Sequence, residues 1–367
     1  MRIYDKNYWD SSENSILSNQ LNETVEKSIC RIASRLNMSG KIIISTSGTT
    51  GSLKFTVISK QSMLRSADAV NKHLNIISND KWLCCLPATH VSGLSVHARA
   101  SQSRSAIVEF KNKWSPDHFI KHINDEEITL CSLVPTQLHD LINLDYKPNA
   151  DLRALIIGGD KLSDEIRTKA LDLGWPVLLT YGMTETCSQV ATENSPGEGM
   201  EVLSIWDIKV STEHELLVKG NSLFDGYIEQ VEGDWKYTEP IPDDGWFSTG
   251  DIANISKNKL TITGRKDSQI KVLGEKINID MLRSTLSILY GQSITLMTFP
   301  DSRKGHKIIM VAEEKSDHAN AFNNYNSSVK SIERAEELII IDNIPHTPLG
   351  KIHMKDLYET LEKRRDA

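Results

Sequence analysis

KIIISTSGTTGSLK, residues 41–54, is a β-branched run that breaks abruptly into a loop of glycines and hydroxyl-bearing side chains. A buried strand followed by such a loop is typical of a phosphate cradle, because glycines let the backbone N–H groups converge on a ligand. Lys54 adds a cation at the end of the loop. The loop is not a Walker motif, since Ser52 and Leu53 follow its second glycine. The alternative interpretation is an ordinary polar hairpin turn.

Strands and helices are expected to alternate on both sides of this loop. A helix is expected before it, over residues 15–38, and a return strand after it, over residues 55–58. The further expected strands are 82–86, 129–134, 154–157 and 177–180, and the expected helices are 61–74, 115–124, 135–144 and 163–173. Alternation of this kind predicts an α/β fold with mostly parallel sheets flanked by helices.

The pattern of expected strands, turns and helices changes twice after this α/β part. From about residue 201, short β-type runs alternate with turns, which indicates a small β-rich subdomain. The last part predicts a compact α+β domain with helices at 280–290 and 318–333 and strands at 293–299, 307–312 and 337–341. The expected organisation is therefore a large domain, 1–264, a hinge, 265–268, and a small mobile domain, 269–367.

Composition and charge exclude several classes of protein. The 367 residues are 39% hydrophobic and carry a net charge of -7, which is ordinary for a globular protein and gives no general attraction to nucleic acid. The five cysteines lack paired metal-ligand spacing, so neither a disulfide framework nor a zinc site is expected. The polar N-terminus and the absence of a long apolar run predict a cytoplasmic setting without integral membrane contact.

Two further motifs follow expected strands of the α/β part. TYGMTET, residues 180–186, could stack Tyr181 on a base and bring Thr184 and Glu185 to phosphate and Mg²⁺. The run Gly158-Gly159-Asp160 could line an adenine edge with its backbone. A capped helix start and an ordinary glycine-rich strand exit are the respective alternatives.

Two more motifs lie toward the C-terminus. GWFSTGD, residues 245–251, ends in Asp251, and Arg265 follows downstream; a carboxylate and a guanidinium can together hold ribose hydroxyls. PHTPLGK, residues 345–351, places Lys351 after a turn rich in proline and glycine. A structural Asp–Arg pair and a solvated turn tip are the alternatives.

Taken together, the five motifs resemble those of the adenylate-forming superfamily, which includes acyl-CoA synthetases, peptide-synthetase adenylation domains and luciferases. They occur in the family order between residues 41 and 353. Within the superfamily, the stretches CSLVPTQL (131–138), GWPV (174–177) and YGMTETCSQV (181–190) are most similar to the o-succinylbenzoate–CoA ligases of menaquinone synthesis.

The resemblance implies a role for each matching residue. Lys351 is implied to be catalytic, together with Thr184 and Glu185, and Glu185 is also implied to bind the metal. The implied nucleotide and CoA contacts are Ser45, Thr46, Ser47, Gly48, Thr49, Thr50, Gly51, Lys54, Gly159, Asp160, Tyr181, Asp251, Arg265 and Gly274. The implied acid-binding residues are His90, Gly93, Gly182 and Gln189, and Asp267 is the implied pivot of the hinge.

The chain departs from the family pattern at three places. Residue 53 is Leu where proline is frequent, and Ile279-Asp280-Met281 stands where the family has proline and two glutamates. Only 44 residues precede the phosphate loop, fewer than family members usually have. The shortened first subdomain is expected to expose apolar surface that a homodimer interface would cover, or to open the acid pocket.

The resemblance implies an acid–CoA ligase that uses ATP, Mg²⁺ and coenzyme A. A small-molecule carboxylic acid would attack ATP to give an acyl-adenylate, and CoA would then take the acyl group. Three alternatives remain open: activation of another aryl or fatty acid, loading of a carrier protein, and a pseudoenzyme that only binds nucleotide.

Overall fold

The computed structural model describes residues 6–19, 21–46, 53–111, 113–346 and 352–365. Contacts between residues divide the chain into two compact units. The first unit comprises Met1–Ser211, Leu216–Thr249 and Asn254–Thr261, and the second comprises Thr212–Glu215, Gly250–Ala253 and Ile262–Ala367. Two short segments of the middle of the chain therefore belong with the C-terminal unit.

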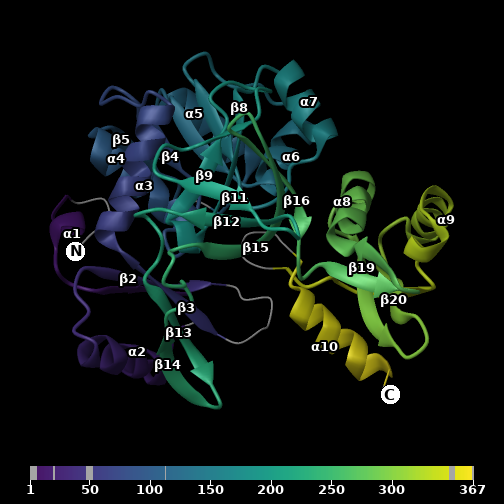
Figure 1. Cartoon of the computed structure of the whole chain (residues 1–367). Helices are drawn as coiled ribbons and strands as arrows, with labels where there is room; N and C mark the ends of the chain where they lie inside the picture. Colours follow the sequence, from purple (N-terminus) through teal and green to yellow (C-terminus); the bar gives the residue numbers. More distant parts are fainter. Residues whose placement is uncertain (1–5, 20, 47–52, 112, 347–351, 366–367) are drawn as a thin grey trace. The chain divides into compact units, whose positions relative to one another are not determined.

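The first unit contains most of a large sheet, including its parallel half (Figure 1). The parallel strands, in their spatial order, are β5 (Ala106–Glu109), β4 (Lys81–Cys84), β6 (Leu130–Leu133), β7 (Ala154–Ile157) and β8 (Val177–Met183). The sheet continues from β8 through β9 (Ser188–Thr192), β10 (Met200–Val202), β16 (Lys259–Arg265), β15 (Phe247–Ser256), β12 (Glu215–Lys219) and β11 (Asp207–Val210). Since β9 is antiparallel to β8, the parallel arrangement ends at the YGMTE motif.

Helices cover both faces of the parallel strands. One face is covered by α5 (Pro116–Asp125), α6 (Pro135–Asn143) and α7 (Asp164–Asp172), and the other by α3 (Lys60–His73) and α4 (Val91–Ser103). Side chains alternate between the two faces, as the pleat requires: Leu83 joins the core under α5–α7, whereas Trp82 and Cys84 point to the α3–α4 face. The predicted α/β class is thereby confirmed.

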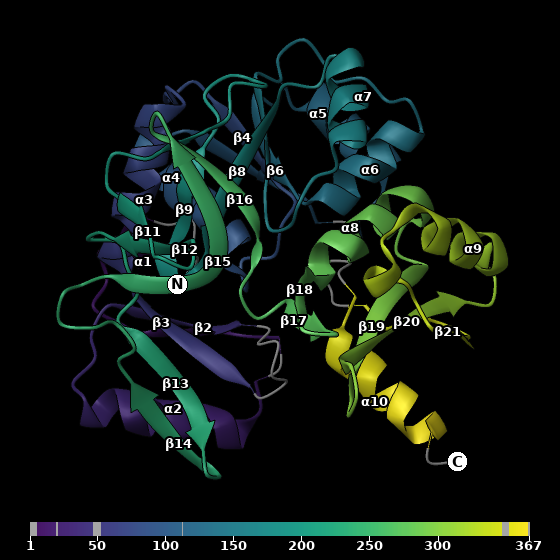
Figure 2. The ribbon, with the colours of Figure 1, turned by 45° about the vertical axis from the view of Figure 1, so that its right-hand side comes forward.

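A second, smaller sheet carries the phosphate-loop hairpin. Its strand order is β1 (Ser15–Leu17), β2 (Lys41–Thr46), β3 (Lys54–Ser59), β13 (Gly226–Val231) and β14 (Asp234–Thr238). Figure 2 shows α2 (Glu23–Arg35) lying across this sheet, and its apolar face packs on Ile43, Phe55 and Ile228. The short helix α1 (Lys6–Asp10) precedes it. Apart from the β1–β2 pair, the pairings within this sheet are antiparallel.

The second unit is an α+β domain built on an antiparallel hairpin. Its elements are β17 (Gln269–Val272), β18 (Glu275–Asn278), α8 (Ile279–Tyr290), β19 (Ile294–Asp301), β20 (Gly305–Glu313), α9 (His318–Ser328), β21 (Glu337–Ile341) and α10 (Met354–Arg365). Alternate residues of β19 and β20 point to opposite faces. One face packs against α8 and α9, and the other packs against α10 through Leu357 and Leu361.

Three expectations about elements need correction. Residues 15–38 are not one helix: Ser15–Leu17 pairs with Ile42–Ile44 as an edge strand, and α2 begins only after Asn22, whose side chain accepts from the Val25 amide at 3.0 Å. The helix expected over 318–333 ends at Ser328, because Val329 is extended. The mostly parallel arrangement is confined to β4–β8.

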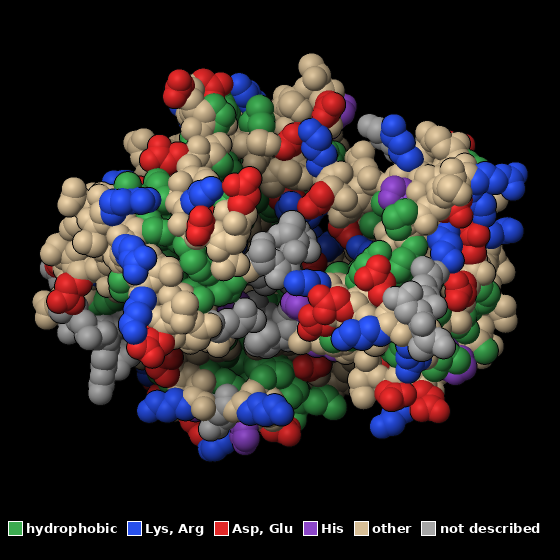
Figure 3. Space-filling model, turned by 90° about the horizontal axis from the view of Figure 1, so that it is seen from below, with side chains coloured by type: hydrophobic (Ala, Val, Ile, Leu, Met, Phe, Trp, Pro, Cys, Tyr) green, Lys and Arg blue, Asp and Glu red, His purple; other side chains and the backbone are tan. Residues whose placement is uncertain are grey.

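Helix α4 was missed for a physical reason. Residues Gly93 to Ala100 are buried although Ser95, His97 and Arg99 are polar, so α4 lacks the division into an apolar buried face and a polar exposed face that identifies an amphipathic helix. Within the part of the chain that the structure describes, no helix is long and apolar enough to cross a bilayer. Figure 3 shows acidic and basic side chains interspersed on one face of the molecule.

Candidate functional site

The phosphate loop connects two paired strands. β2 and β3 are antiparallel, and Thr46 at the end of β2 is the register partner of Lys54 at the start of β3. Ser45 is half-buried near the end of β2. The predicted phosphate contacts Ser47, Gly48, Thr49, Thr50 and Gly51 lie outside the described residues.

Lys54 and Glu185 are joined through one tyrosine. The Lys54 Nζ lies 3.3 Å from the centroid of the Tyr227 ring and 3.5 Å from Oε2 of Glu229. The Tyr227 hydroxyl donates to Oε1 of Glu185 at 2.8 Å. The structure therefore brings the phosphate-loop lysine and the proposed metal-binding carboxylate, which are far apart in the sequence, into contact with one side chain.

Strand pairing explains how Tyr227 reaches this position. Lys54 is the register partner of Glu229 on β13, and Tyr227 is the partner of Thr56. Burial, the Glu185 charge and the hydrogen bond to Glu185 together raise the pKa of Tyr227, so this hydroxyl stays a donor at neutral pH. Sequence reasoning missed Tyr227 because it lies in the β-rich stretch, outside the five motifs.

The turn that carries Thr184 and Glu185 depends on Gly182. β8 leads into a 3₁₀ turn, Thr184–Thr186, and β9 returns antiparallel with a register shift between Tyr181 and Gly182. A Cβ on Gly182 would lie 1.6 Å from the Ser188 carbonyl oxygen. Gly182 is thus required for the close approach of the two strands, whether or not it also contacts an acid.

The predicted adenine-binding residues lie at one edge of the parallel sheet. Ile157 on β7 is the register partner of Leu179 on β8. Gly159 and Tyr181 each follow two residues later, so they leave the same edge on neighbouring strands. This is the carboxyl edge, where ligands bind in open α/β sheets. Asp160 comes next, and its Oδ1 accepts from the Lys161 amide at 2.8 Å.

The predicted acid-binding residues have different surroundings. His90 immediately precedes α4, and burial lowers its pKa, so the imidazole is neutral at pH 7. Gly93 allows the first turn of α4 to approach the backbone, because a Cβ there would lie 2.3 Å from the Leu86 carbonyl oxygen. Gln189 is buried and accepts from the Thr192 hydroxyl at 3.0 Å.

Arg99 on α4 is a charged group that sequence reasoning missed. Its side chain is only 2% exposed, and burial lowers its pKa to about 10. The guanidinium lies 5.6 Å from the Trp82 ring and donates to the Ser188 hydroxyl at 3.3 Å. No carboxylate of the described residues forms an ion pair with it. A buried cation without a counter-ion is costly, which makes Arg99 a candidate ligand for an anion.

The second unit contains the predicted ribose-binding pair. Arg265 Nη1 lies 3.2 Å from Oδ1 of the buried Asp251, and Arg265 Nε lies 2.9 Å from Oδ1 of Asp267. Arg265 therefore bridges the proposed ribose carboxylate and the proposed pivot. The Asp–Arg pair exists in the structure, and its contact with ribose stays a prediction.

Gly274 and Lys351 are the remaining residues of the C-terminal unit to which the family resemblance gives a role. Gly274 has φ +86° and follows Leu273 at φ 51° in the two-residue turn between β17 and β18. A Cβ on Gly274 would meet no atom within 4 Å, so its surroundings are open. Lys351 lies outside the described residues; the flanking residues His346 and Ile352 form an isolated antiparallel bridge.

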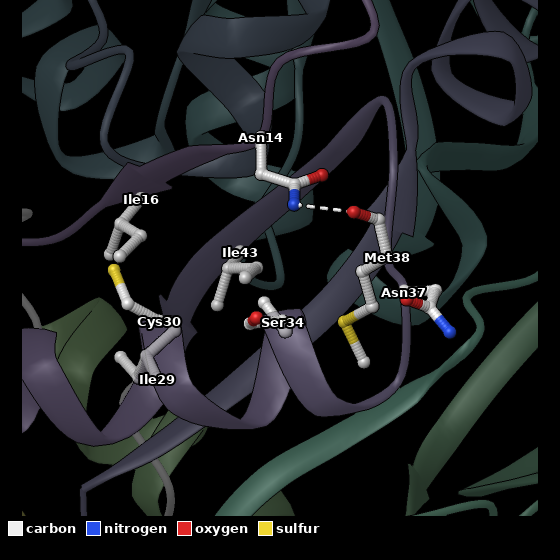
Figure 4. A pocket seen from close by; sticks show the side chains of 9 residues that line it. Asn14, Ile16, Ile29, Cys30, Ser34, Asn37, Met38 and Ile43 are labelled. Atoms are coloured by element: carbon white, nitrogen blue, oxygen red, sulfur yellow. Dashed lines mark hydrogen bonds between the residues drawn. The ribbon is translucent and has the colours of Figure 1, made fainter.

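A separate hollow lies between α2 and strands β1 and β2 (Figure 4). Its volume is about 510 Å³, and its walls include Ile16, Ile29, Met38 and Ile43. Asn14 closes one side by donating to the Met38 carbonyl at 2.8 Å. Of the implied site residues that the structure describes, none lines this hollow.

The class of protein follows from these motifs together with a family match. A model of the AMP-binding enzyme family matches residues 40–228, just over half of the chain. The chain belongs to this family, as the motif resemblance implied. The matched segment contains the phosphate loop, the Gly159 turn and the YGMTE motif, together with Arg99 and Tyr227.

Individual relatives indicate which kind of AMP-binding enzyme this chain is similar to. The 2-succinylbenzoate–CoA ligase of Listeria monocytogenes serotype 4b is 28% identical over 330 residues, which are 86% of this chain and 69% of that relative. The ligase of the same name from Staphylococcus epidermidis is 29% identical, over 85% of this chain and 68% of that relative.

A solved structure is similar over the same span. The o-succinylbenzoate coenzyme A synthetase of Bacillus subtilis, in complex with ATP and a magnesium ion, aligns with a TM-score of 0.74 at 25% identity. The alignment covers 86% of this chain and 69% of the solved one. This chain thus spans just over two thirds of the length of these relatives.

Proposed function

We propose that this protein is an ATP-dependent acid–CoA ligase that converts o-succinylbenzoate to o-succinylbenzoyl-CoA through an acyl-adenylate. The observation that supports it most directly is the chain of contacts from Lys54 through Tyr227 to Glu185. These contacts bring a cation that can bind phosphate close to a carboxylate that can bind its metal ion. The names and folds of the relatives support the choice of acid.

The first half-reaction is the attack of a carboxylate oxygen on the α-phosphorus of ATP. The new oxygen–phosphorus bond gives acyl-AMP, and pyrophosphate leaves with the electrons of the broken bond. Lys54 and the loop before it hold the β- and γ-phosphates, and Lys351 stabilises the charge at the α-phosphate. Mg²⁺, for which the Glu185 carboxylate is a suitable hard ligand, neutralises phosphate charge when bound. The protein itself contributes positioning and electrostatic stabilisation.

The second half-reaction transfers the acyl group to CoA. The thiolate attacks the carbonyl carbon of the mixed anhydride, and AMP leaves with the electrons of the acyl–oxygen bond. We place Gly274 beside the incoming thiol and Asp267 at the pivot about which the C-terminal unit rotates between the two half-reactions.

Arg99 is the proposed ligand of the carboxylate that does not react. o-Succinylbenzoate has two carboxylates, and only one forms the mixed anhydride. The second enters as an anion and needs a cation if it is to leave water. Arg99 is buried without a carboxylate partner among the described residues, and a bidentate guanidinium pair would compensate for its burial.

The decisive measurement is ATP–pyrophosphate exchange that depends on the acid supplied. The panel should contain o-succinylbenzoate, benzoate and a fatty acid, followed by CoA or a holo-carrier protein as acceptor. Exchange that is strongest with o-succinylbenzoate, with transfer to CoA, is the expected result. Strongest exchange with another acid, or transfer to the carrier alone, would favour those alternatives. ATP binding without any exchange would identify a pseudoenzyme.

Arg99→Gln separates the choice of acid from the chemistry. We expect a KM for o-succinylbenzoate at least tenfold higher, on the order of the loss of a charge-assisted hydrogen bond, with the KM for ATP unchanged. Arg104→Gln is the matched control, since Arg104 is exposed at the end of the same helix. An unchanged KM for the acid in Arg99→Gln would contradict the assignment.

Two further expectations belong to this proposal, one about the oligomeric state of the protein and one about its location in the cell. A homodimer would be detected by light scattering of the purified chain, and a single-chain mass would contradict it. A cytoplasmic location fits a ligase that draws on ATP and CoA, and fractionation of cells would test it.

A further inference from the structure

A cysteine, a histidine and a glutamate from three different elements face one another in the first unit. Cys84 ends β4 and Glu109 ends β5, and the two residues are register partners in parallel strands. Their side chains therefore point to the same face of the sheet. Helix α4 packs on that face and contributes His97. The fold thus builds the cluster from residues that are not near neighbours in the sequence.

Both neighbours approach the same atom of the histidine. Cys84 Sγ lies 3.7 Å from Nε2 of His97, and Glu109 Oε1 lies 3.3 Å from that nitrogen. The three atoms all lie within 4.8 Å of one another. A single ring nitrogen forms one good hydrogen bond, so a hydrogen-bonded network would satisfy only one of the two contacts well.

The two distances match the edges of a tetrahedral zinc site. Zinc bonds are about 2.3 Å to sulfur, 2.0–2.1 Å to imidazole nitrogen and 2.0–2.2 Å to carboxylate oxygen. A tetrahedral angle then gives edges of about 3.6 Å between sulfur and nitrogen and about 3.4 Å between nitrogen and oxygen. The observed separations of Cys84 and Glu109 from His97 Nε2 differ from these values by about 0.1 Å.

The surroundings are polar and enclosed on one side. The side chain of His97 is 3% exposed, whereas that of Glu109 is 39% exposed, so an ion could enter past the glutamate. Ser132 on β6 is the other register partner of Cys84. Its buried hydroxyl has no hydrogen-bond partner among the described residues.

The protonation states suit metal binding. Burial lowers the pKa of His97 to about 4, so its imidazole is neutral at pH 7, as a ligand must be. Burial, together with the charge of Glu109, raises the pKa of Cys84 to about 12. A divalent cation would displace this thiol proton, and the binding would release it to solvent.

We propose that Cys84, His97 and Glu109 form a binding site for a divalent transition-metal ion of the zinc class. A thiolate, an imidazole and a carboxylate favour Zn²⁺ over Mg²⁺, which prefers oxygen ligands alone. A solvent molecule on the Glu109 side completes the coordination. The three ligands do not include the proposed magnesium ligand Glu185, and the ion would join α4 to β4 and β5. The absence of paired cysteine spacing argued against a zinc site in the sequence, but the ligands of this site come from three different elements and need no such spacing.

Cobalt provides a direct test in the full chain. Chelator-treated, reduced protein is titrated with Co²⁺ in the presence of excess Mg²⁺, and the thiolate-to-cobalt charge-transfer band is recorded. We expect one equivalent of Co²⁺ to saturate the band, and Zn²⁺ to abolish it by displacement. Cys84→Ser should lose the band, whereas Cys30→Ser, which removes an exposed thiol on α2, should retain it.

A second variant and a second measurement keep the test independent of folding defects. Glu109→Gln should weaken Zn²⁺ binding by more than the roughly 10–100-fold typical of losing an outer-shell partner. Added Zn²⁺ should raise the Tm of the wild-type chain and raise that of Glu109→Gln less. A wild-type chain without the charge-transfer band, or a band that Cys30→Ser removes and Cys84→Ser retains, would overturn the proposal. In that case the three groups are a hydrogen-bonded cluster only.

Discussion

Tyr227 shows how a single residue can join two motifs. The Lys54 ammonium lies over the face of its ring, and its hydroxyl donates a hydrogen bond to one oxygen of Glu185. A cation over an aromatic face and a hydrogen bond to a carboxylate are separate interactions. They can therefore be removed one at a time, and each should affect a different part of ATP binding.

Replacement of Tyr227 by phenylalanine removes only the hydrogen bond. We expect kcat/KM for MgATP in pyrophosphate exchange to fall about tenfold or more, because a hydrogen bond to a charged group contributes about 1.5–3 kcal/mol. The free energy of unfolding should change little by comparison. Tyr237→Phe is the control, since that hydroxyl donates to the Asp225 carbonyl instead. Equal losses in the two variants would contradict a specific role for Tyr227.

At the scale of elements, close contacts between strands set the geometry of the site. β8 and β9 approach so closely at Gly182 that no side chain fits between them. The 3₁₀ turn with Thr184 and Glu185 lies directly beyond this contact. The position of the two catalytic candidates is therefore a consequence of strand packing.

Gly182→Ala should force β8 and β9 apart. A Cβ at 1.6 Å from the Ser188 oxygen cannot be accommodated without a backbone shift, and overpacking of this kind costs about 1–3 kcal/mol. We expect the urea midpoint to fall and the affinity for MgATP to fall with it. Gly174→Ala, at φ +91° with no atom within 4 Å of the added carbon, should lower stability alone. An equal loss of ATP affinity in both variants would show a merely global effect.

Asp80 connects several elements at the opposite edge of the parallel sheet. Burial acts to raise its pKa, but hydrogen bonds from Arg153, the Ile77 amide and the Thr129 hydroxyl outweigh it and hold the pKa below its ordinary value of 3.8. Because the folded pKa lies below the unfolded one, this stabilisation is present above pH 3.8 and is lost as the pH falls further.

Acid titration of stability tests this linkage. The difference in urea midpoint between wild type and Asp80→Asn should be largest near pH 7 and should shrink as the pH falls below about 3.8. Asp125→Asn, which removes an exposed ion pair with Lys121, should show little difference at any pH. A constant difference between wild type and Asp80→Asn across the range would contradict the role of ionisation.

At the scale of the molecule, the two units carry different parts of the proposed reaction. The phosphate loop, Glu185 and Arg99 belong to the first unit, whereas Asp251, Arg265 and Gly274 belong to the second. Lys351 also lies in the chain segment assigned to the second unit. Rotation of the second unit would let one site serve two half-reactions in turn.

Lys351→Ala should separate the two half-reactions. We expect acyl-adenylate formation to fall by about 100-fold or more, as for the loss of a group that stabilises transition-state charge. Thioester formation from a supplied acyl-adenylate should remain near the wild-type rate. Equal losses in both half-reactions would contradict the two-state mechanism.

Gly274→Val is the complementary variant. Its φ of +86° strains any side chain, and the added atoms would obstruct the proposed thiol passage. Thioester formation should slow while pyrophosphate exchange is retained. Loss of exchange in Gly274→Val would contradict a role limited to the second half-reaction.

Much of the fold was predictable from local patterns. The β-branched run at residues 41–44, the glycine-rich turns and the alternation of strands and helices depend on interactions between near neighbours, and these are read directly from residue order. The same holds for the five motifs and their order, and the family match covers the three that lie between residues 40 and 228. The buried helix α4 was not predictable in this way, because a helix that is covered on every side has no polar period.

Contacts between distant residues depended on how the strands pair and how the helices cover them. Tyr227 meets Glu185, Arg99 meets Ser188, and Cys84 meets Glu109 because of strand register and helix packing. No local sequence pattern predicts these contacts, since each joins residues that are remote in the sequence and of types that occur at many other positions. Burial, which makes Arg99 and His97 chemically unusual, is a property of the folded chain and not of residue order.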